Sequence, residues 1–377
     1  MHTSDTLWIW QQHDWPKFTW DNSKLASRLR HLHYQQGLLV GSSEPDHSLE
    51  QQLDALLNNL VCSSAIEGEA LNAQSVRSSL AKRLGLHSDA PYPTSLRSEG
   101  LAEMMMDAIT QLDQPLTTKQ LYQWHTWLFP EPDVWAGRIR VGQLRGDEPM
   151  QVVSGRIDRP TIHFEAPPRM GLEQHVEQFL DWFNDSVQQH QLDPLLRAAI
   201  AHLWFVTLHP FDDGNGRITR ALTDRALAQG DAKSIRLYAM SVAILDHRQG
   251  YYDILEQTQR GELDITDWLL WFCQILTETI DSALAQVQQT LQKTRFWHRH
   301  HLTELLPEQK KVLNRMLDGD FADGISAAKY QSVGRVSKPT ATRHLSNLVE
   351  KGCLKKQEGG GRNTRYVLNL VALTSRT

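Results

Sequence analysis

The chain has 377 residues, of which 40% are hydrophobic, so it is long enough for two or three domains with their own cores. Its net charge of −5 makes any basic segment a local feature of an acidic chain. No run of about 18 apolar residues predicts a membrane span, and Met1–Leu7 lack a signal-peptide pattern. Three widely separated cysteines, Cys62, Cys273 and Cys353, exclude a disulfide framework. We therefore expect a cytoplasmic protein with no membrane partner.

The N-terminal segment is rich in tryptophan, with Trp8, Trp10, Trp15 and Trp20 close together. Large aromatic rings contribute strongly to the free energy of burial. We therefore expect this segment to pack as an arm on the rest of the protein.

A helix is predicted next, because Leu53, Leu56, Leu57 and Leu60 recur at helical spacing. It runs into Ser63–Gly68, where a glycine is suited to end a helix. Glu67 stands at this predicted end, where a negative charge is slightly unfavourable with the helix dipole.

Residues 150–154 and 161–164 are two β-rich runs around a polar turn, which predicts a β-hairpin. An isolated hairpin is only marginally stable in water. We therefore expect this hairpin to lie on a larger body.

Residues 195–208 are mostly apolar, which predicts a largely buried helix. His209 stands at its end, because Pro210 opposes continuation of the helix. An imidazole with an ordinary pKa of about 6.5 can accept a proton at neutral pH. His209 is therefore a candidate general base.

A glycine-framed turn follows, Gly214-Asn215-Gly216. Glycine permits positive φ angles, which can direct successive backbone N–H groups to one point. A second helix is predicted over Ala221–Ala228, so the turn opens onto a helix N-terminus, a position that suits a phosphate.

Three charged residues add to this turn. Arg217 and Arg220 are three residues apart and can point toward one anion. Asp213 offers a hard oxygen ligand for Mg²⁺, which proteins usually hold with one or two carboxylates plus substrate phosphates. Together these residues suit a nucleoside triphosphate that is attacked by a protein hydroxyl.

The C-terminal region has a different pattern. Its predicted elements are three helices followed by two strands around a glycine-rich loop, at residues 308–317, 326–330, 337–351, 352–356 and 364–368. A helix–turn–helix followed by a glycine-tipped hairpin resembles a winged helix.

This region is also basic, because residues 326–366 hold nine Lys and Arg against two Glu, a net charge of +7. Such a segment is typical of binding to the phosphate backbone of double-stranded DNA. We expect Thr340, Thr342 and Arg343 to face a DNA groove, and Arg362 of the wing to contact phosphate. Winged helices also mediate protein contacts and dimerisation, so that alternative stays open.

Residues 209–220, His-Pro-Phe-Asp-Asp-Gly-Asn-Gly-Arg-Ile-Thr-Arg, resemble the Fic-domain signature H-x-F-x-(D/E)-G-N-G-R-x-x-R at every specified position. The resemblance implies a mainly α fold, a helical bundle with a β-hairpin flap. It also implies a protein adenylyltransferase, which moves AMP from ATP to a Ser, Thr or Tyr hydroxyl of a target protein or of itself.

Site residues follow from the same resemblance. His209 would deprotonate the target hydroxyl, and Asp213 would hold Mg²⁺ on the α- and β-phosphates of ATP. The implied ATP-binding residues are Gly214, Asn215, Gly216, Arg217, Ile218, Thr219, Arg220 and Tyr251. Among these, Arg217 would cradle the inner phosphates, Arg220 would meet the γ-phosphate, and Tyr251 would line the adenosine site.

Two further segments look typical of the family. Ser63–Gly68 is similar to the inhibitory motif (S/T)-x-x-x-E-(G/N), which implies that Glu67 pairs with Arg220 and inhibits the enzyme. The hairpin would be the flap, in which Val153, Ser154 and Gly155 clamp a target segment by strand addition. The tryptophan-rich start is similar to that of a group of bacterial Fic proteins, which indicates a bacterial source.

The predicted domains are an N-terminal arm (1–47), helices with the inhibitory motif (48–115), a Fic core (116–295) and a winged helix (296–377). Two other functions remain open. One is a DNA-binding regulator whose core senses nucleotide without turnover; the other is an enzyme that removes AMP, with Glu67 aligning a water. Fic proteins often pair their subunits, so a homodimer is one expected assembly.

Overall fold

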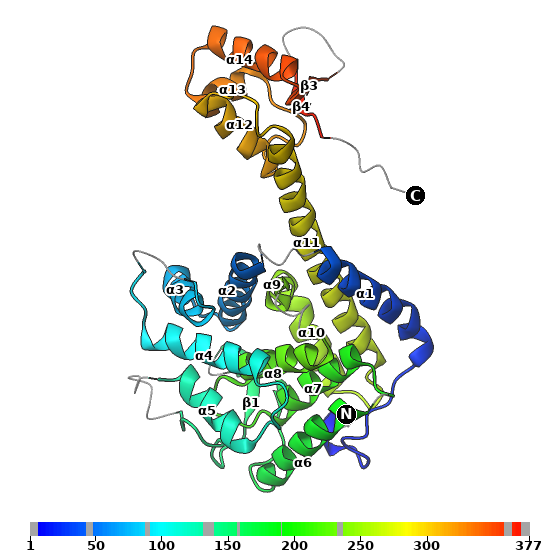
Figure 1. Ribbon diagram of the computed structural model, residues 1–377. Coiled ribbons are helices and arrows are strands. Elements are labelled where there is room, and N and C mark those ends of the chain that lie inside the picture. The colour runs from blue at the N-terminus through cyan, green and yellow to red at the C-terminus, as the bar shows by residue number, and fades with distance from the viewer. Residues whose placement is uncertain are drawn as a thin grey trace. The chain divides into compact units, whose positions relative to one another are not determined.

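The computed structural model describes residues 7–42, 48–86, 91–130, 139–156, 159–189, 191–231, 237–357 and 364–370. The chain divides into two compact units, Met1–Ala283 and Leu284–Thr377 (Figure 1). The prediction of a mainly helical chain is confirmed. None of the helices described is long and apolar enough to cross a membrane.

The described helices of the first unit are α1 (Asn22–Ser42), α2 (Ser48–Ile66), α3 (Ala73–Arg83), α4 (Leu96–Thr110), α5 (Thr118–Leu128), α6 (Leu172–Asp185), α7 (Pro194–Leu208), α8 (Asn215–Gly230), α9 (Met240–Asp246) and α10 (Arg248–Gln259). Short 3-10 helices lie at Ile9–Gln11 (η1) and Ser186–Gln188 (η3). Helix α11 (Thr266–Arg299) begins in the first unit and continues into the second.

Helices α7 and α8 form the centre of the first unit (Figure 1). Every residue from Leu195 to Leu208 in α7 is buried, as its apolar sequence predicts. Asp193 starts this helix by accepting a hydrogen bond from the Leu195 N–H at 2.9 Å, and Pro194 fits the first turn because it needs no N–H acceptor. Helix α8 packs along α7 and also contacts α2, α4 and α5.

Helix α8 begins at Asn215, six residues earlier than the predicted start at Ala221. Gly214 is its N-cap with φ 80°, a left-handed conformation that favours glycine. The helix therefore starts directly after this glycine, and Arg217 and Arg220 project from its first turns. The predicted start at Ala221 was therefore too late.

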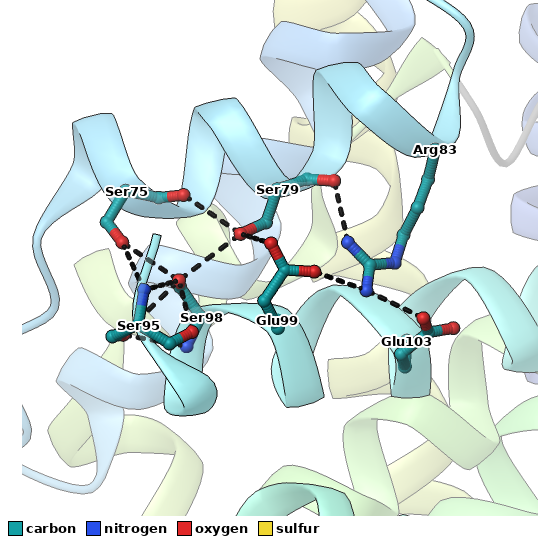
Figure 2. A network of polar contacts seen from close by, with 7 residues as sticks. All are labelled: Ser75, Ser79, Arg83, Ser95, Ser98, Glu99 and Glu103. Carbon is teal, nitrogen blue, oxygen red and sulfur yellow. Dashed lines mark hydrogen bonds and ion pairs between the residues drawn. The ribbon is translucent and has the colours of Figure 1, made fainter. Parts of the chain in front are cut away.

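Helices α3 and α4 are joined by a buried polar network. The Oγ atoms of Ser75 and Ser98 lie 2.8 Å apart, and Ser79 donates to Glu99 at 3.1 Å. Arg83 forms ion pairs with Glu99 and Glu103, both at 2.6 Å. Figure 2 shows this network of Ser75, Ser79, Arg83, Ser95, Ser98, Glu99 and Glu103. Because Ser95 is the N-cap of α4, the network fixes the beginning of that helix against α3.

The strands of the first unit, β1 (Gln151–Arg156) and β2 (Arg159–Glu165), pair in antiparallel fashion. Val152 opposes Phe164, whereas Val153 opposes Ile162, so His163 is the extra residue of a β-bulge. Ser154 opposes Thr161. A bulge redirects side chains from their regular alternation, here at the middle of β2.

The N-terminal arm packs on β2 and on the helices. The Trp10 indole donates to the Glu165 carbonyl at 2.7 Å, and the Trp8 ring meets Phe164 edge-on at 5.4 Å. Trp15 meets Trp204 of α7 edge-on at 6.3 Å. The arm thus packs against β2 of the hairpin and against α7.

The second unit contains the last part of α11, then α12 (Pro307–Leu317), α13 (Ala327–Gly334), α14 (Lys338–Glu350), β3 (Leu354–Lys356) and β4 (Tyr366–Leu368). Strands β3 and β4 are antiparallel, and Ile325 forms a β-bridge with Tyr366. Its core includes Val312, Leu313, Ile325, Tyr330, Leu345 and Leu348. Arg362 lies outside the described residues.

Candidate functional site

A cleft of about 850 Å³ brings together segments that are far apart in the sequence. It is lined by Glu67 from just after α2, His209 and Asp213 from the turn after α7, Ser154 from β1 and Tyr251 from α10. Other predicted residues that line it are Val153, Gly214, Asn215 and Gly216. The predicted site residues that are not among its lining residues are Arg217, Ile218, Thr219, Arg220 and Gly155.

His209 is held in one orientation at the end of α7. Its φ of 47° is left-handed, and its backbone N–H donates to Phe205 O at 3.2 Å. Nδ1 lies 3.2 Å from the Val206 carbonyl, which can only accept, so this nitrogen carries the proton. Burial lowers the pKa of His209, so the ring is neutral at pH 7 and Nε2 keeps its lone pair. His209 can therefore accept a proton.

Asn215 holds the turn closed. Its Oδ1 accepts from the Phe211 N–H at 2.9 Å, and its Nδ2 donates to the Phe211 carbonyl at 2.8 Å. The Asn215 side chain thus has a structural role in the turn, and the expected contact of its backbone N–H with phosphate stays a prediction. Ile218 and Thr219 also face the core, where the Thr219 hydroxyl donates to Asn215 O at 2.7 Å.

His125 supports the same turn from α5, and the sequence analysis did not find it. Its Nδ1 accepts from the Gly142 N–H at 2.9 Å, so Nε2 carries the proton and donates to the Asp213 carbonyl at 3.2 Å. Its ring stacks on Phe211 at 4.4 Å. Burial lowers its pKa to about 4. A single histidine within a helix gives no sequence signal for this role.

Arg145 is a second support that the sequence did not reveal. This buried guanidinium donates from Nε to the His209 carbonyl at 2.9 Å and from Nη2 to the Pro167 carbonyl at 2.5 Å. Its backbone N–H donates to Pro210 O at 3.0 Å. The backbone on both sides of the His209–Pro210 bond is therefore tied to one residue.

Glu67 forms an ion pair with Arg220, as the sequence resemblance implied. Its Oε1 lies 2.9 Å from Nη2 of Arg220, whose side chain is only 3% exposed. Arg220 also donates to the hydroxyl and the carbonyl of Ser63, both at 2.7 Å. Burial alone would raise the pKa of Glu67, but the charge and hydrogen bond of Arg220, together with the smaller effects of Arg217 and His209, outweigh it and lower the pKa. The pair is therefore charged at neutral pH.

The Glu67 carboxylate also lies against the first turn of α8. A Cβ atom added at Gly216 would lie 2.1 Å from Oε1 of Glu67, so this approach requires glycine. Free N–H groups and the positive end of the helix dipole favour an anion at such a place. Glu67 thus occupies a position that would suit a phosphate.

Arg217, the other arginine of the signature, is paired with Glu69. Nη1 of Arg217 lies 2.6 Å from Oε2 of Glu69, and its Nη2 lies 3.4 Å from Asp213. Arg97, in the first turn of α4, binds the other oxygen of Glu69. The sequence analysis missed Glu69, because the inhibitory motif ends one residue before it. Two carboxylates after α2 therefore hold Arg217 and Arg220, the two arginines of the signature.

Helix α10 forms the remaining wall of the cleft. Tyr251 is 2% exposed, and its hydroxyl lies 2.9 Å from Nε2 of buried His202, so the ring borders the cleft while its polar end faces the core. Arg248 donates to the Ile66 carbonyl at 2.7 Å. This bond ties the end of α2 to the helix that carries Tyr251.

Asp213 is the residue that suits a metal ion. Among the described residues, no group of three or more His, Cys, Asp or Glu side chains is arranged to hold one. The Asp213 side chain is 55% exposed in the cleft, and Oδ1 accepts from the Gly214 N–H at 2.5 Å. One carboxylate is enough for Mg²⁺ that arrives with substrate phosphates, so the donor set fits this ion.

Comparison with known proteins agrees with this geometry. Residues 115–227 match the model of the Fic/DOC family, so the chain carries a Fic-type domain. Residues 8–86 match a domain of unknown function, DUF4172. The chain is 24% identical to protein adenylyltransferase Fic of Aedes aegypti over 259 residues, which are 67% of this chain and 47% of that protein. It is 25% identical to the Drosophila willistoni protein of the same name over 267 residues, 70% and 48% of the two chains. The chain spans about half the length of these curated relatives.

Two solved structures show the same fold. The crystal structure of a Fic family protein from Desulfovibrio desulfuricans G20 aligns with a TM-score of 0.50 at 18% identity, over 90% of this chain and 95% of the other. Fic-1 of C. elegans aligns with a TM-score of 0.51 at 19% identity, over 72% and 74% of the two chains. These identities are low, so the likeness concerns the fold alone.

The buried histidines predict how stability depends on pH. The pKa of His125 is about 4 in the fold against an ordinary 6.5, so between these values the unfolded chain binds more protons and stability falls as pH falls. His202, with a pKa of about 3, acts in the same direction. From about pH 7.5 to about pH 5, His125→Gln should lose about 2 kcal/mol less stability than the wild type.

Urea unfolding followed by tryptophan fluorescence measures this difference. His13→Gln is the control, since the His13 side chain is 97% exposed and should keep the wild-type pH dependence. Equal pH dependence in the wild type and His125→Gln would contradict the assigned neutral state of His125.

Proposed function

We propose that this protein transfers AMP from ATP to a hydroxyl group of a protein side chain, and that it is held inactive by its own Glu67. The contact between Glu67 and Arg220 at the N-terminus of α8 carries this proposal. Support comes from the neutral His209 in the same cleft and from relatives named protein adenylyltransferase Fic.

In the proposed reaction, Nε2 of His209 accepts the proton of the target hydroxyl. The hydroxyl oxygen attacks the α-phosphorus of ATP, the bond from that phosphorus to the oxygen bridging to the β-phosphate breaks, and pyrophosphate leaves. The first N–H groups of α8, Arg217 and Arg220 hold the phosphates and stabilise their charge. Asp213 would hold Mg²⁺, which supplies further positive charge to the phosphates.

The target segment is proposed to bind beside β1. Strands β1 and β2 form a two-stranded sheet within the described residues, so one edge of β1 is free to pair. Val153, Ser154 and Gly155 are exposed on this strand, and the first two line the cleft. Pairing through backbone groups would bring a target hydroxyl to His209 with little demand on the target's sequence.

In this proposal, Glu67 inhibits the enzyme because it competes with the terminal phosphate of ATP for Arg220 and for the N-terminus of α8. A carboxylate on Arg220 and against the first turn of α8 repels the terminal phosphate of ATP and removes its partner. ATP can then bind only with its phosphates displaced from the position for in-line attack. Release requires that the segment after α2 leave the cleft.

Replacing Glu67 by glycine should release the enzyme. With α-labelled ATP and Mg²⁺, Glu67→Gly should label proteins of a cell extract about 10- to 100-fold more than the wild type does, a coupling of about 1–3 kcal/mol. Adding His209→Ala in the same chain should lower that label by about 10²- to 10⁴-fold, because the general base is lost.

Equal labelling by the wild type and Glu67→Gly would refute the inhibitory role. Undiminished labelling by the double variant would refute the role of His209. If ATP binds but no form labels any protein, AMP transfer is wrong, and nucleotide sensing or AMP removal becomes the better account.

Unlike Glu67, Glu69 should weaken the binding of ADP as well as of ATP, because its partner Arg217 contacts the inner phosphates in the proposed complex. Glu69→Gln frees Arg217, so it should raise the affinity for ADP and for ATP alike, by about 5-fold for about 1 kcal/mol. Titration calorimetry measures both affinities, and Glu50→Gln, an exposed change on α2, is the control. Unchanged affinity for ADP would show that Glu69 does not restrain Arg217.

We propose as a second function that the C-terminal unit binds double-stranded DNA. The observation in favour is the exposed basic surface of α13, α14 and the residues beside them, formed by Lys329, Arg335, Lys338 and Arg343. The Thr340 hydroxyl pairs with that of Ser337 at 2.9 Å and the Thr342 hydroxyl donates to Lys338 O at 3.2 Å. Both threonines are thus engaged in the fold of α14, which leaves Arg343 as the best-placed contact.

Substitution of Arg343 tests this second function. Arg343→Gln should weaken binding of the full chain to duplex DNA and reduce the slope of log affinity against log salt by about 1. Gel-shift titration at several salt concentrations measures the slope, with Lys310→Gln on exposed α12 surface as the control. A slope unchanged by Arg343→Gln, or an absence of duplex binding by the wild type, would contradict the proposal.

A further inference from the structure

Three side chains at the edge of the cleft form a hydrogen-bonded chain that the proposed reaction does not use. Ser154 Oγ of β1 lies 2.5 Å from Nε2 of His163 on β2, and Nδ1 of His163 lies 2.6 Å from Oε2 of Glu256 on α10. We call these three residues the flap triad. All three line the same cleft as His209.

The fold holds this arrangement in place from several sides. His163 is the extra residue of the bulge in β2, which turns its side chain toward Ser154 and Glu256. Glu256 belongs to helix α10, and Arg260 on the next turn donates to the Ile162 carbonyl at 2.6 Å while pairing with Glu256 at 3.2 Å. The hairpin is therefore fixed to α10 at the triad.

The hydrogen bonds of His163 with Glu256 and with Ser154 make the Ser154 hydroxyl a candidate nucleophile. A carboxylate only accepts, so Nδ1 of His163 carries the proton and donates to Glu256. Nε2 then holds a lone pair directed at Ser154 Oγ. A serine next to a histidine that is oriented by a carboxylate is the arrangement that activates hydroxyl nucleophiles in many enzymes.

The reacting partner of this hydroxyl follows from its location. The cleft that contains Ser154 also contains His209, Asp213 and the N-terminus of α8, the groups proposed to hold the phosphates of ATP. In the proposed function, the electrophile bound in this cleft is therefore the α-phosphorus of ATP.

We propose that Ser154 is a site of self-modification, which accepts AMP from ATP bound in the same chain once Glu67 has left the cleft. This inference rests on the proposed function. Ser154 Oγ bonds to the α-phosphorus, its proton passes to Nε2 of His163, and Glu256 stabilises the resulting imidazolium. The bond from the α-phosphorus to the oxygen bridging to the β-phosphate breaks, and pyrophosphate leaves with that electron pair.

Modification at this position has a consequence for target binding. Ser154 lies in the part of β1 beside which a target strand is proposed to pair, and it opposes Thr161 within the hairpin. AMP attached there would cover that part of β1 and fill part of the cleft. Self-modification would thus limit the time for which a released enzyme acts on its targets.

The test uses the full chain with Glu67→Gly, α-labelled ATP and Mg²⁺, and maps the modified residue by mass spectrometry of peptides. AMP is expected on Ser154, at a rate that does not change with protein concentration, since the transfer is within one chain. Ser154→Ala should remove this modification, and Ser154→Thr should retain it on the new hydroxyl. Thr161→Val, which removes a hydroxyl from the opposing strand, should leave it unchanged.

Two further variants test whether His163 and Glu256 activate Ser154 or whether Ser154 is modified only because it is exposed. Glu256→Gln and His163→Gln should each slow modification of Ser154 by at least about 10-fold, as expected when a general base or its orienting partner is lost.

AMP on other residues of Glu67→Gly, with none on Ser154, would overturn this inference and leave the proposed function intact. Modification of Ser154 that is insensitive to both His163→Gln and Glu256→Gln would also overturn it, because the triad would then do nothing. No transfer of AMP to any protein would refute the proposed function and this inference together.

Discussion

The ion pair between Glu67 and the buried Arg220 is the interaction on which this site depends. Removing charges from water is costly, so a buried guanidinium needs hydrogen-bond acceptors, and an anion is the strongest of these. Arg220 is 3% exposed, and among the described residues it has, besides the hydroxyl and carbonyl of Ser63, one negatively charged partner. In this structure the partner is the protein's own carboxylate, and in the proposed complex it is a phosphate of ATP. In the proposed function, the same groups of Arg220 would therefore stabilise the inhibited form and contribute to the affinity for nucleotide.

The surrounding fold makes this exchange of anions possible. Helices α7 and α8 are buried along most of their length, and the turn between them is closed by Asn215, His125 and Arg145. This part presents a rigid helix N-terminus. The segment after α2 is attached differently, through polar contacts of Glu67, Glu69 and the Ile66 carbonyl. Polar contacts can be replaced by those of a charged ligand, whereas a packed apolar core cannot. The proposed function therefore requires movement of the segment after α2 rather than of α7 or α8.

Much of this site could be predicted from the sequence, for identifiable physical reasons. The apolar run of α7 predicted where that helix ends, and so the position of the candidate base His209. Within residues 209–220, proline, glycine and arginine each indicate a local feature, namely a helix end, a turn or an anion-binding group. The resemblance to an inhibitory motif placed Glu67 on Arg220, and the structure contains that pair. These features depend on short stretches of sequence whose geometry is fixed by neighbouring residues.

The features that could not be predicted depend on contacts between distant residues. His125 and Arg145 reach the turn across 88 and 64 positions, and nothing in their own neighbourhoods distinguishes them. Asn215, Ile218 and Thr219 belong to the signature, yet their side chains face the fold, because α8 begins at Asn215 rather than at Ala221. The flap triad requires a bulge in β2, and a bulge depends on the register of two strands and leaves no local pattern.

The most direct test of the account is the ratio of ATP affinity to ADP affinity, measured by titration calorimetry with Mg²⁺ for the wild type and for Glu67→Gly. If Glu67 holds the partner of the terminal phosphate, the wild type should bind ATP no more tightly than ADP. Glu67→Gly should then prefer ATP by about 10-fold or more, since a charge-assisted contact to Arg220 becomes available. The same ratio in both proteins would contradict the claim that Glu67 and the terminal phosphate compete for Arg220.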